Sequence, residues 1–371
     1  MKVALVHDYL KEYGGAERVV EVLHEIFPDA PLYTAYVDLD SMPEFGKRFK
    51  DWDIKSSWLQ KFPLFLISPF RVFAPMIFES FDLSQYDLVI SSCNTYFSKA
   101  VITKPGSLHI SYIHTPPRYL YGYTTSFNYK KNPVTRVLGE IANHFLRIYD
   151  FETSQRPDIL VANSKNVADR IKKFYRRDSV VIYPPVTLPV IPSPSTTLGV
   201  NSARNLKTKN PYFLSVSRLV RGKGVEVIIE ACAKLDLPLK VVGVGPELEN
   251  LKRLLRRVAP RNDVQFLGQV SDDELADLYA NAKATILASE DEDFGIVPVE
   301  SMAAGTPVIA TKAGGFLETV VNGKTGVLYE GTLEEGLEAF EGLELKEEDC
   351  RKQAEKFSKE RFKKEILKLL Q

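Results

Sequence analysis

Two glutamates, Glu292 and Glu300, flank a short segment whose residue types suit a phosphorylated sugar. Carboxylates accept hydrogen bonds in pairs, so they match the vicinal hydroxyls of sugars and riboses. Between them, Phe294-Gly295-Ile296-Val297 predicts a glycine turn and then a helix from Pro298, a position where backbone N–H groups suit phosphate. A ligand that combines sugar, ribose and phosphate is a nucleotide sugar, which is the hypothesis this segment supports.

Positive charge precedes another predicted helix. The segment Ser217–Gly224 follows an apolar run and contains Arg218, Lys223 and two glycines. The forked guanidinium of Arg218 can grip a phosphate and Lys223 supplies a point charge, so a diphosphate could be held without a metal. The alternative interpretation is a turn with two surface cations.

Two pairs of glycines also separate a predicted strand from a predicted helix. Gly243 and Gly245 have this position, but Leu248 replaces the third glycine of a dinucleotide fingerprint. We interpret this pair as a tight turn beside a nucleotide base. Gly14 and Gly15 follow the first strand, where bare backbone could approach a sugar or phosphate. A turn that only begins the helix is the alternative.

His114 follows a further predicted strand and is expected at the same kind of strand-end site. A neutral histidine could hydrogen-bond a sugar hydroxyl, and a charged one could pair with phosphate. A structural histidine is the alternative, as for His109 within the strand. Asp291 and Asp293 form an Asp-x-Asp pair, but no His or further Asp cluster completes an oxygen cage, so no metal is expected.

These positions require a scaffold of strands and helices. Near-continuous Val, Ile and Leu runs between amphipathic stretches indicate parallel strands buried on both faces. In the first half we expect strands and helices at Val3–His7, Ala16–Ile26, Leu32–Tyr36, Leu88–Ser92, Leu108–Ile113, Thr135–Ser154, Ile159–Ala162 and Lys165–Phe174. The pattern restarts with Tyr212–Val216, Gly224–Leu235, Leu239–Val242, Pro246–Val258, Val264–Leu267, Ser271–Ala280, Ala284–Ala288, Pro298–Ala304, Val308–Ala310 and Gly315–Val321.

The chain therefore divides into parts. We predict an N-terminal α/β domain over 1–185, a Pro-rich polar linker over 186–210 and a nucleotide-sugar-binding α/β domain over 211–346. The last segment, 347–371, has a long charged helical pattern with no following strand. The three cysteines are isolated, which disfavours a zinc site or disulfides and fits a reducing compartment.

Charge and hydropathy bear on the partners. Lys and Arg number 48 and so do Asp and Glu, so no global field attracts nucleic acid. Residues 99–177 hold fourteen Lys/Arg against five Asp/Glu, a local excess of nine. This excess could attract anionic lipid or a phosphorylated acceptor, or it could be a solvated basic helix face.

One segment has the composition of a membrane interface. Residues 58–81 combine many aromatic and aliphatic side chains with scattered cations. Pro63, Pro69 and Pro75 disfavour one long amphipathic helix, and a buried loop-and-helix cap is the alternative. No apolar run is long enough to span a bilayer, and the first apolar run is too short for a signal peptide.

Together the motifs resemble the retaining glycosyltransferases of family 4, which have the GT-B fold. The resemblance rests on Ser217-Arg218-Leu219, Lys223-Gly224, Gly243-x-Gly245-Pro246, Glu292-Asp293-Phe294-Gly295, Glu300-x-x-Ala303-x-Gly305-x-Pro307-Val308 and Gly314-Gly315. In the first domain, Tyr112-x-His114-Thr115-Pro116, Arg118-Tyr119 and Ala162-Asn163-Ser164 resemble mannosyltransferases of cell-surface polysaccharide assembly. The implied architecture is α/β, with two Rossmann-like doubly wound domains facing a central cleft. The resemblance further implies that the domain over 1–185 is the acceptor side and that the helix over 347–371 packs back on it.

The resemblance also implies roles for individual residues. Four of them would act at the reacting centre or on the departing diphosphate: His114, Arg218, Lys223 and Glu292. The others would bind the donor, with Glu300 on the ribose: Gly14, Gly15, Gly243, Gly245, Phe294, Gly295, Ile296, Val297 and Glu300. Many relatives have a third small residue where this chain has Glu17 after Gly14-Gly15-Ala16.

The implied function is transfer of mannose from GDP-mannose to a lipid-linked saccharide, without a metal or other cofactor, on the cytoplasmic face of a membrane. A UDP-sugar-dependent glucosyl-, galactosyl- or N-acetylhexosaminyltransferase is the first alternative. A non-catalytic subunit that binds sugar nucleotides is the second, but it should lack Arg218, Lys223 or Glu292, and all three are present.

Overall fold

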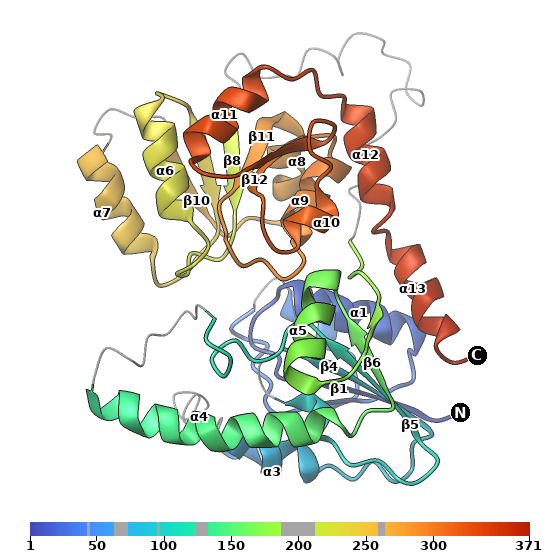
Figure 1. The fold of residues 1–371 in the computed structure, drawn as a ribbon. Coiled ribbons are helices and arrows are strands. Elements are labelled where there is room, and N and C mark those ends of the chain that lie inside the picture. The colour runs from blue at the N-terminus through green and yellow to red at the C-terminus, as the bar shows by residue number, and fades with distance from the viewer. Residues whose placement is uncertain (43–44, 63–72, 95–96, 124–132, 187–211, 259–263) are drawn as a thin grey trace. The chain divides into compact units, whose positions relative to one another are not determined.

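The chain forms two compact α/β units in the computed structural model, which describes residues 1–42, 45–62, 73–94, 97–123, 133–186, 212–258 and 264–371 (Figure 1). Unit 1 consists of Met1–Pro185 together with Lys359–Gln371. Unit 2 consists of Val186–Ser358. Nearly all of the predicted linker, residues 187–210, lies outside the described residues.

Unit 1 is built on a parallel sheet with strand order β3-β2-β1-β4-β5-β6-β7. The strands are β1 (Val3–His7), β2 (Leu32–Thr34), β3 (Ile54–Ser56), β4 (Leu88–Cys93), β5 (Leu108–Ile113), β6 (Ile159–Ala162) and β7 (Val180–Val181). The helices of the described residues are α1 (Gly15–Ile26), α3 (Ala74–Glu79), α4 (Pro133–Ser154), α5 (Lys165–Tyr175) and α13 (Lys359–Lys368), with the short 3₁₀ turns η1 (Gly46–Phe49), η2 (Trp58–Lys61) and η5 (Ser98–Ala100).

Helices cover both faces of this sheet, which makes it doubly wound. On one face, α1 and α13 bury Val19, Leu23, Phe362 and Ile366 against β1, β4 and β5. On the other face, α3 and the buried side of α4 pack against β1 and β4, and α5 packs against β6. Because the strands are buried on both faces, they read as continuous apolar runs, as predicted.

One cation of the basic stretch is not at the surface. Lys99 is fully buried and forms an ion pair with Asp150 of α4, which also accepts a hydrogen bond from Tyr121 at 2.7 Å. Burial lowers the pKa of Lys99, but the charge and hydrogen bond of Asp150, together with the charges of Cys93 and Asp8, raise that pKa above its ordinary value. The excess of nine charges over 99–177 therefore overstates the positive charge that this unit presents to solvent.

Unit 2 has its own parallel sheet, with strand order β10-β9-β8-β11-β12-β13. The strands are β8 (Tyr212–Val216), β9 (Leu239–Val242), β10 (Val264–Gly268), β11 (Ala282–Leu287), β12 (Val308–Thr311) and β13 (Gly326–Tyr329). The helices are α6 (Val225–Lys234), α7 (Leu248–Val258), α8 (Asp272–Asn281), α9 (Ile296–Ala303), α10 (Phe316–Thr319), α11 (Leu333–Glu341) and α12 (Glu347–Glu355).

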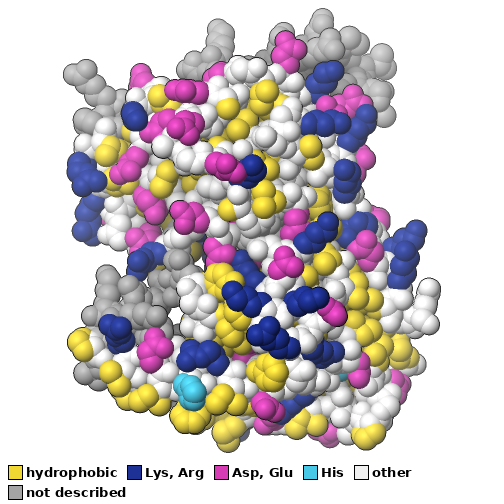
Figure 2. All heavy atoms as spheres, viewed as in Figure 1, with side chains coloured by type: hydrophobic (Ala, Val, Ile, Leu, Met, Phe, Trp, Pro, Cys, Tyr) yellow, Lys and Arg dark blue, Asp and Glu magenta, His cyan; other side chains and the backbone are white. Residues whose placement is uncertain are grey.

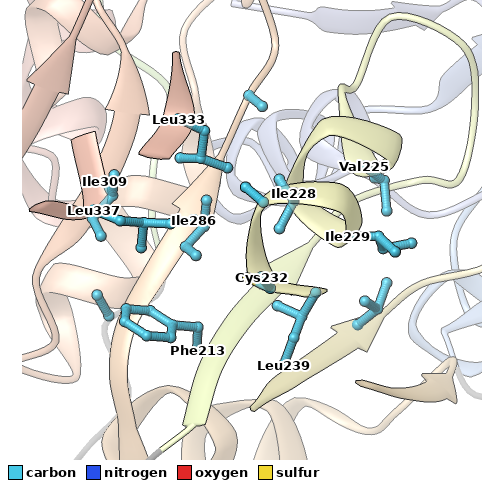
Figure 3. Close-up of a cluster of buried hydrophobic side chains, with 14 of the residues drawn as sticks. Phe213, Val225, Ile228, Ile229, Cys232, Leu239, Ile286, Ile309, Leu333 and Leu337 are labelled. Atoms are coloured by element: carbon cyan, nitrogen blue, oxygen red, sulfur yellow. The ribbon is translucent and has the colours of Figure 1, made fainter. Parts of the chain in front are cut away.

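The core of unit 2 lies between the sheet and helices α6 and α11. Figure 3 shows Ile228, Ile229 and Cys232 of α6 directed at the strand side chains Phe213, Leu239, Ile286 and Ile309, with Leu333 and Leu337 of α11 beside them. The opposite face is covered by α8, through the buried Tyr279, and by the segment that follows α9. This packing fixes the strand ends from which the candidate site loops leave.

The C-terminal segment differs from the single helix expected over 347–371. It forms α12 and α13, separated at Phe357 and Ser358, and the division between the units falls directly after Ser358. Phe357 is buried against Phe294 in unit 2, with ring centroids 5.4 Å apart, and Ser358 forms a bridge with Val186. These contacts end the first helix before Lys359 begins the second.

The segment 58–81 shows features of both interpretations. Residues 63–72 lie outside the described part of the chain. Around them, Leu59, Ile77 and Phe78 are buried as a cap would require, whereas Phe73 and Met76 are exposed. None of the described helices is both long and apolar enough to cross a bilayer.

Candidate active site

The predicted donor-side residues of unit 2 follow strands that end at one edge of the sheet. From β8 the chain proceeds to β9 and β10 on one side, and then returns to β11 on the other. The strand order therefore reverses between β8 and β11, and ligands of doubly wound sheets bind beyond the carboxyl ends of strands at such a point. Arg218 and Lys223 follow β8, and Glu292 follows β11.

Lys223 and Glu292 form an ion pair across this reversal point. Lys223 Nζ donates to Glu292 Oε2 at 2.7 Å, and the two side chains are 29% and 20% exposed. An ammonium has three donors and a carboxylate about four acceptor sites, so each group can hold its partner and a ligand together. The structure thus joins two residues that the sequence motifs assign to different parts of the donor.

Glu300 is the best-anchored acid of the predicted site. It lies on α9 with only 8% of its surface exposed, and its Oε2 accepts a hydrogen bond from Tyr279 Oη at 2.9 Å. Tyr279 is itself buried on α8. One carboxylate oxygen is therefore fixed by a neighbouring helix, and an ionised carboxylate offers about four acceptor sites in all.

Glycines shape the loops around these acids. Gly295 precedes α9 with φ of 85°, in the left-handed region that favours glycine. It is followed by Ile296 and Val297, whose backbone N–H groups lie in the first helical turn and have no partner within the helix. Phe294 is buried, and Gly315 N–H donates to Glu292 O at 2.9 Å, so the loop that carries Glu292 is held from both sides.

The packing of two loops explains why positions 243 and 245 are glycines. A Cβ at Gly243 would lie 1.8 Å from Ser217 O, and one at Gly245 would lie 2.2 Å from Leu219 O. These glycines let the loop after β9 pack on the loop that carries Arg218. They therefore position the cation loop, whether or not a nucleotide base also contacts them.

The predicted residues of unit 1 gather at the equivalent point of its sheet, where the order reverses between β1 and β4. His114 is buried beyond the end of β5, and its Nε2 lies 2.9 Å from Ser92 Oγ. Ser92 Oγ lies 3.2 Å from His7 Nδ1, and His7 Nε2 lies 3.3 Å from Glu17 Oε1. A chain of four hydrogen-bonded side chains therefore connects His114 to α1.

The two histidines in this series of hydrogen bonds, His7 and His114, have pKa values shifted in opposite directions. Burial lowers the pKa of His7, but the hydrogen bond and charge of Glu17 outweigh burial and raise that pKa above 6.5. Burial and the neighbouring His7 lower the pKa of His114 to about 3. His114 is therefore neutral at physiological pH, which favours the sugar-hydroxyl role over pairing with phosphate.

The glycine loop of unit 1 is tied to the same chain. Gly14 is the N-cap of α1 and donates its N–H to Glu17 Oε2 at 2.8 Å, while Gly15 is the first helical residue. Glu17 thus holds His7 with one carboxylate oxygen and the Gly14 backbone with the other. The turn that begins the helix and the histidine site are one hydrogen-bonded assembly.

Replacing Glu17 with glutamine is expected to destabilise the protein by about 1–3 kcal/mol, and more at low pH than at high pH. The raised pKa of His7 means that its protonation stabilises the fold below pH 6.5, and this contribution is lost as pH rises through the folded-state pKa. Without the carboxylate, the lowering effect of burial on the pKa of His7 would be opposed by the smaller effects of the Asp8 charge and the Ser92 backbone hydrogen bond. The measurement is urea unfolding at about pH 6 and about pH 9.

The matched control for this variant is Glu21→Gln on the same helix. Glu21 pairs with Arg48 and accepts a hydrogen bond from Tyr13 Oη at 2.6 Å, both at a partly exposed site and neither from a histidine, so a loss of about 1 kcal/mol without pH dependence is expected. An equal loss at both pH values in the Glu17 variant would contradict the charged state of His7.

Several residues of these assemblies are absent from the sequence prediction: His7, Glu17, Ser92 and Tyr279. His7 carried a usable signal, because a histidine followed by Asp8 at the end of a buried strand is polar where the strand pattern is apolar. Ser92 and Tyr279 carried no such signal, since a serine in a strand and a tyrosine in a helix are common.

The three cysteines are buried and not in disulfides, and burial raises the pKa of each thiol to about 12.

Comparison with solved structures defines the fold class. The Anabaena protein HepE in complex with UDP-glucose matches with a TM-score of 0.69 and 19% identity, over 100% of this chain and 99% of its own. Sucrose-phosphate synthase from Thermosynechococcus elongatus matches with a TM-score of 0.72 and 18% identity, over 100% and 98%. The chain has the GT-B glycosyltransferase fold, as the motifs predicted.

Residues 201–359 match the family model of glycosyl transferases group 1. A D-inositol 3-phosphate glycosyltransferase from Corynebacterium diphtheriae is 31% identical over 50% of this chain and 47% of its own. A GDP-mannose-dependent alpha-(1-6)-phosphatidylinositol monomannoside mannosyltransferase from Mycolicibacterium smegmatis is 38% identical over 33% and 35%. The chain thus spans about half the length, or less, of the curated relatives it matches.

Proposed function

We propose that this protein is a retaining glycosyltransferase of family 4 that uses a nucleotide-diphosphate sugar. The observation that carries the proposal is the Lys223–Glu292 pair at the strand-order reversal of unit 2, with Glu300 held by Tyr279 on the helix that follows. The cation Lys223, the carboxylate Glu292 for sugar hydroxyls and the carboxylate Glu300 for ribose hydroxyls all lie within the segment that matches the group 1 glycosyl transferases. Nucleotide-sugar binding accounts for all three.

In the proposed reaction the acceptor hydroxyl attacks the anomeric carbon on the face from which the diphosphate leaves. The new C–O bond forms as the bond to the phosphate oxygen breaks, its electron pair goes to that oxygen, and the acceptor proton passes to the leaving phosphate. Arg218 and Lys223 stabilise the negative charge that develops there. Glu292 binds sugar hydroxyls, and neutral His114 hydrogen-bonds the sugar near the reacting carbon.

For the donor we propose GDP-mannose, bound without a metal or cofactor, and for the acceptor a lipid-linked saccharide on the cytoplasmic face of a membrane. The similarity to the GDP-mannose-dependent enzyme of Mycolicibacterium smegmatis supports the donor. A UDP-sugar is the second candidate, because the neighbouring HepE structure contains UDP-glucose.

The test is the thermal midpoint of the protein with GDP-, UDP-, ADP- and dTDP-sugars, in buffer that contains a chelator. A ligand that binds only the native state raises the midpoint in a concentration-dependent way. A shift with GDP-mannose alone is the expected result. A shift with a UDP-sugar alone would replace the donor, and the absence of any shift would overturn nucleotide-sugar binding by the free protein.

A further inference from the structure

Helix α4 of unit 1 buries an unusual number of polar side chains. Beside the core residue Leu146, its buried side carries Asn143, Asp150, Thr153 and Ser154, of which the last three are completely buried. Asp150 forms an ion pair with Lys99 and accepts a hydrogen bond from Tyr121 at 2.7 Å, so this side is fixed to the rest of the unit by hydrogen bonds as well as by packing. An amphipathic helix normally buries its apolar face, so the opposite face of α4 needs an explanation.

That opposite face carries an apolar stripe, in which His144 and Glu152 are the exposed polar side chains. Exposed large side chains recur at spacings of three and four residues, which places them on one side of the helix: Val137 59%, Leu138 63%, Ile141 53%, Phe145 65%, Ile148 51% and Phe151 40%. Helix α3 adds Met76, 60% exposed, and is joined to α4 by the hydrogen bond from Tyr149 to Glu79 at 3.1 Å. Contiguous apolar surface of this kind marks an interaction site.

The stripe is bordered by positive charge. Arg136 of α4 is exposed, and α5, which packs beside α4, exposes Lys165, Lys172 and Lys173, of which Lys172 forms a solvent-exposed ion pair with Asp178 at 3.1 Å. Figure 2 shows hydrophobic side chains along α4 and Lys and Arg side chains gathered next to them over α5.

We propose that the apolar stripe of α4 docks on a lipid bilayer that contains anionic lipid. Apolar and aromatic side chains on one helical face enter the boundary between headgroups and acyl chains, while bordering cations attract the anionic headgroups. A second copy of this chain is disfavoured as the occupant, because it would bring the same cations against this border. The inference does not depend on the donor or the reaction, since it needs only the outer face of unit 1.

The experiment is vesicle co-sedimentation of the full chain in the absence of nucleotide. The vesicles contain phosphatidylcholine alone or with about one-quarter phosphatidylglycerol. The stripe variant is Ile141→Ser/Phe145→Ser/Ile148→Ser, which is expected to lower the affinity for anionic vesicles roughly tenfold or more. The matched control, Val180→Ser/Val227→Ser/Leu367→Ser, removes three other exposed apolar side chains and should bind like the wild type.

A charge variant separates the two contributions. Lys172→Gln/Lys173→Gln should weaken binding to anionic vesicles by about fivefold per cation and leave weak binding to neutral vesicles unchanged. Each variant should have the same thermal midpoint as the wild type without the donor. It should also show the same increase in midpoint with the donor, which shows that the variant folds and keeps the donor site.

Two results would overturn the proposal. One is vesicle binding by the stripe variant that equals wild-type binding. The other is no binding of the wild type to anionic vesicles; if light scattering then shows a dimer that the stripe variant loses, the occupant is a second copy. Neither result affects the proposed glycosyl transfer, which is tested by the donor panel.

Discussion

Lys223→Ala is expected to lower kcat by about a thousandfold. The ammonium of Lys223 would stabilise the charge that develops on the departing diphosphate, and this interaction is strongest in the transition state. Its pairing with Glu292 at 2.7 Å holds it in place beforehand. The measurement is initial-rate kinetics with the donor identified by the thermal panel and a matching acceptor.

The control for this variant is Lys234→Ala in the same unit. Lys234 pairs with Glu334 at the surface, where its side chain is 71% exposed, so rates like those of the wild type are expected. The fold should survive in both variants, because the Lys223–Glu292 pair is partly exposed and worth about 1 kcal/mol. Wild-type turnover in Lys223→Ala would refute the role of this lysine and weaken the whole assignment.

Glu300→Ala is expected to weaken donor binding by about 10- to 100-fold, with a smaller effect on kcat. The carboxylate would accept hydrogen bonds from the ribose, a part of the donor that does not react, so its contribution is similar in the ground state and the transition state. Because Glu300 is 8% exposed, these hydrogen bonds form in a desolvated site. The measurement is calorimetric titration of the nucleoside diphosphate.

Deoxyribose nucleotides make this prediction specific. Wild-type protein should bind the 2′- or 3′-deoxy nucleotide less tightly than the parent, whereas Glu300→Ala should bind the two alike. Tyr279→Phe keeps the Glu300 carboxylate and removes only its 2.9 Å hydrogen bond, so a loss of nucleotide affinity between those of the wild type and Glu300→Ala is expected. Equal discrimination between nucleotides in the wild type and Glu300→Ala would place the ribose elsewhere.

The sequence predicted unit 2 more completely than unit 1, for a physical reason. In unit 2 each site loop can be recognised from the local sequence, since Arg218, Gly243 and Glu292 each follow an apolar strand within a few residues. Parallel strands place such loops at one sheet edge without further information. The edge strand β13 and helix α11 were not predicted, because Gly326 interrupts the strand pattern and the helix directly follows.

The histidine assembly of unit 1 depends on partners that are distant in sequence. His7 meets Ser92 across 85 residues, and Ser92 meets His114 across 22, because β1, β4 and β5 are neighbours in the sheet. Lys99 and Asp150, 51 residues apart, were likewise counted as surface charge. Pairing of this kind follows from register between strands and helices, which local patterns do not contain.

The location of α13 has a consequence for biosynthesis. Phe362 and Ile366 fill the core of unit 1, yet all of unit 2 is translated before them. Domains generally fold as they emerge from the ribosome, N-terminal first. Here the first unit has to wait with an incomplete core until residues 359–371 have been made, whereas the second unit, a continuous segment, can finish earlier. Chaperone demand during synthesis should therefore fall on the earlier half of the chain.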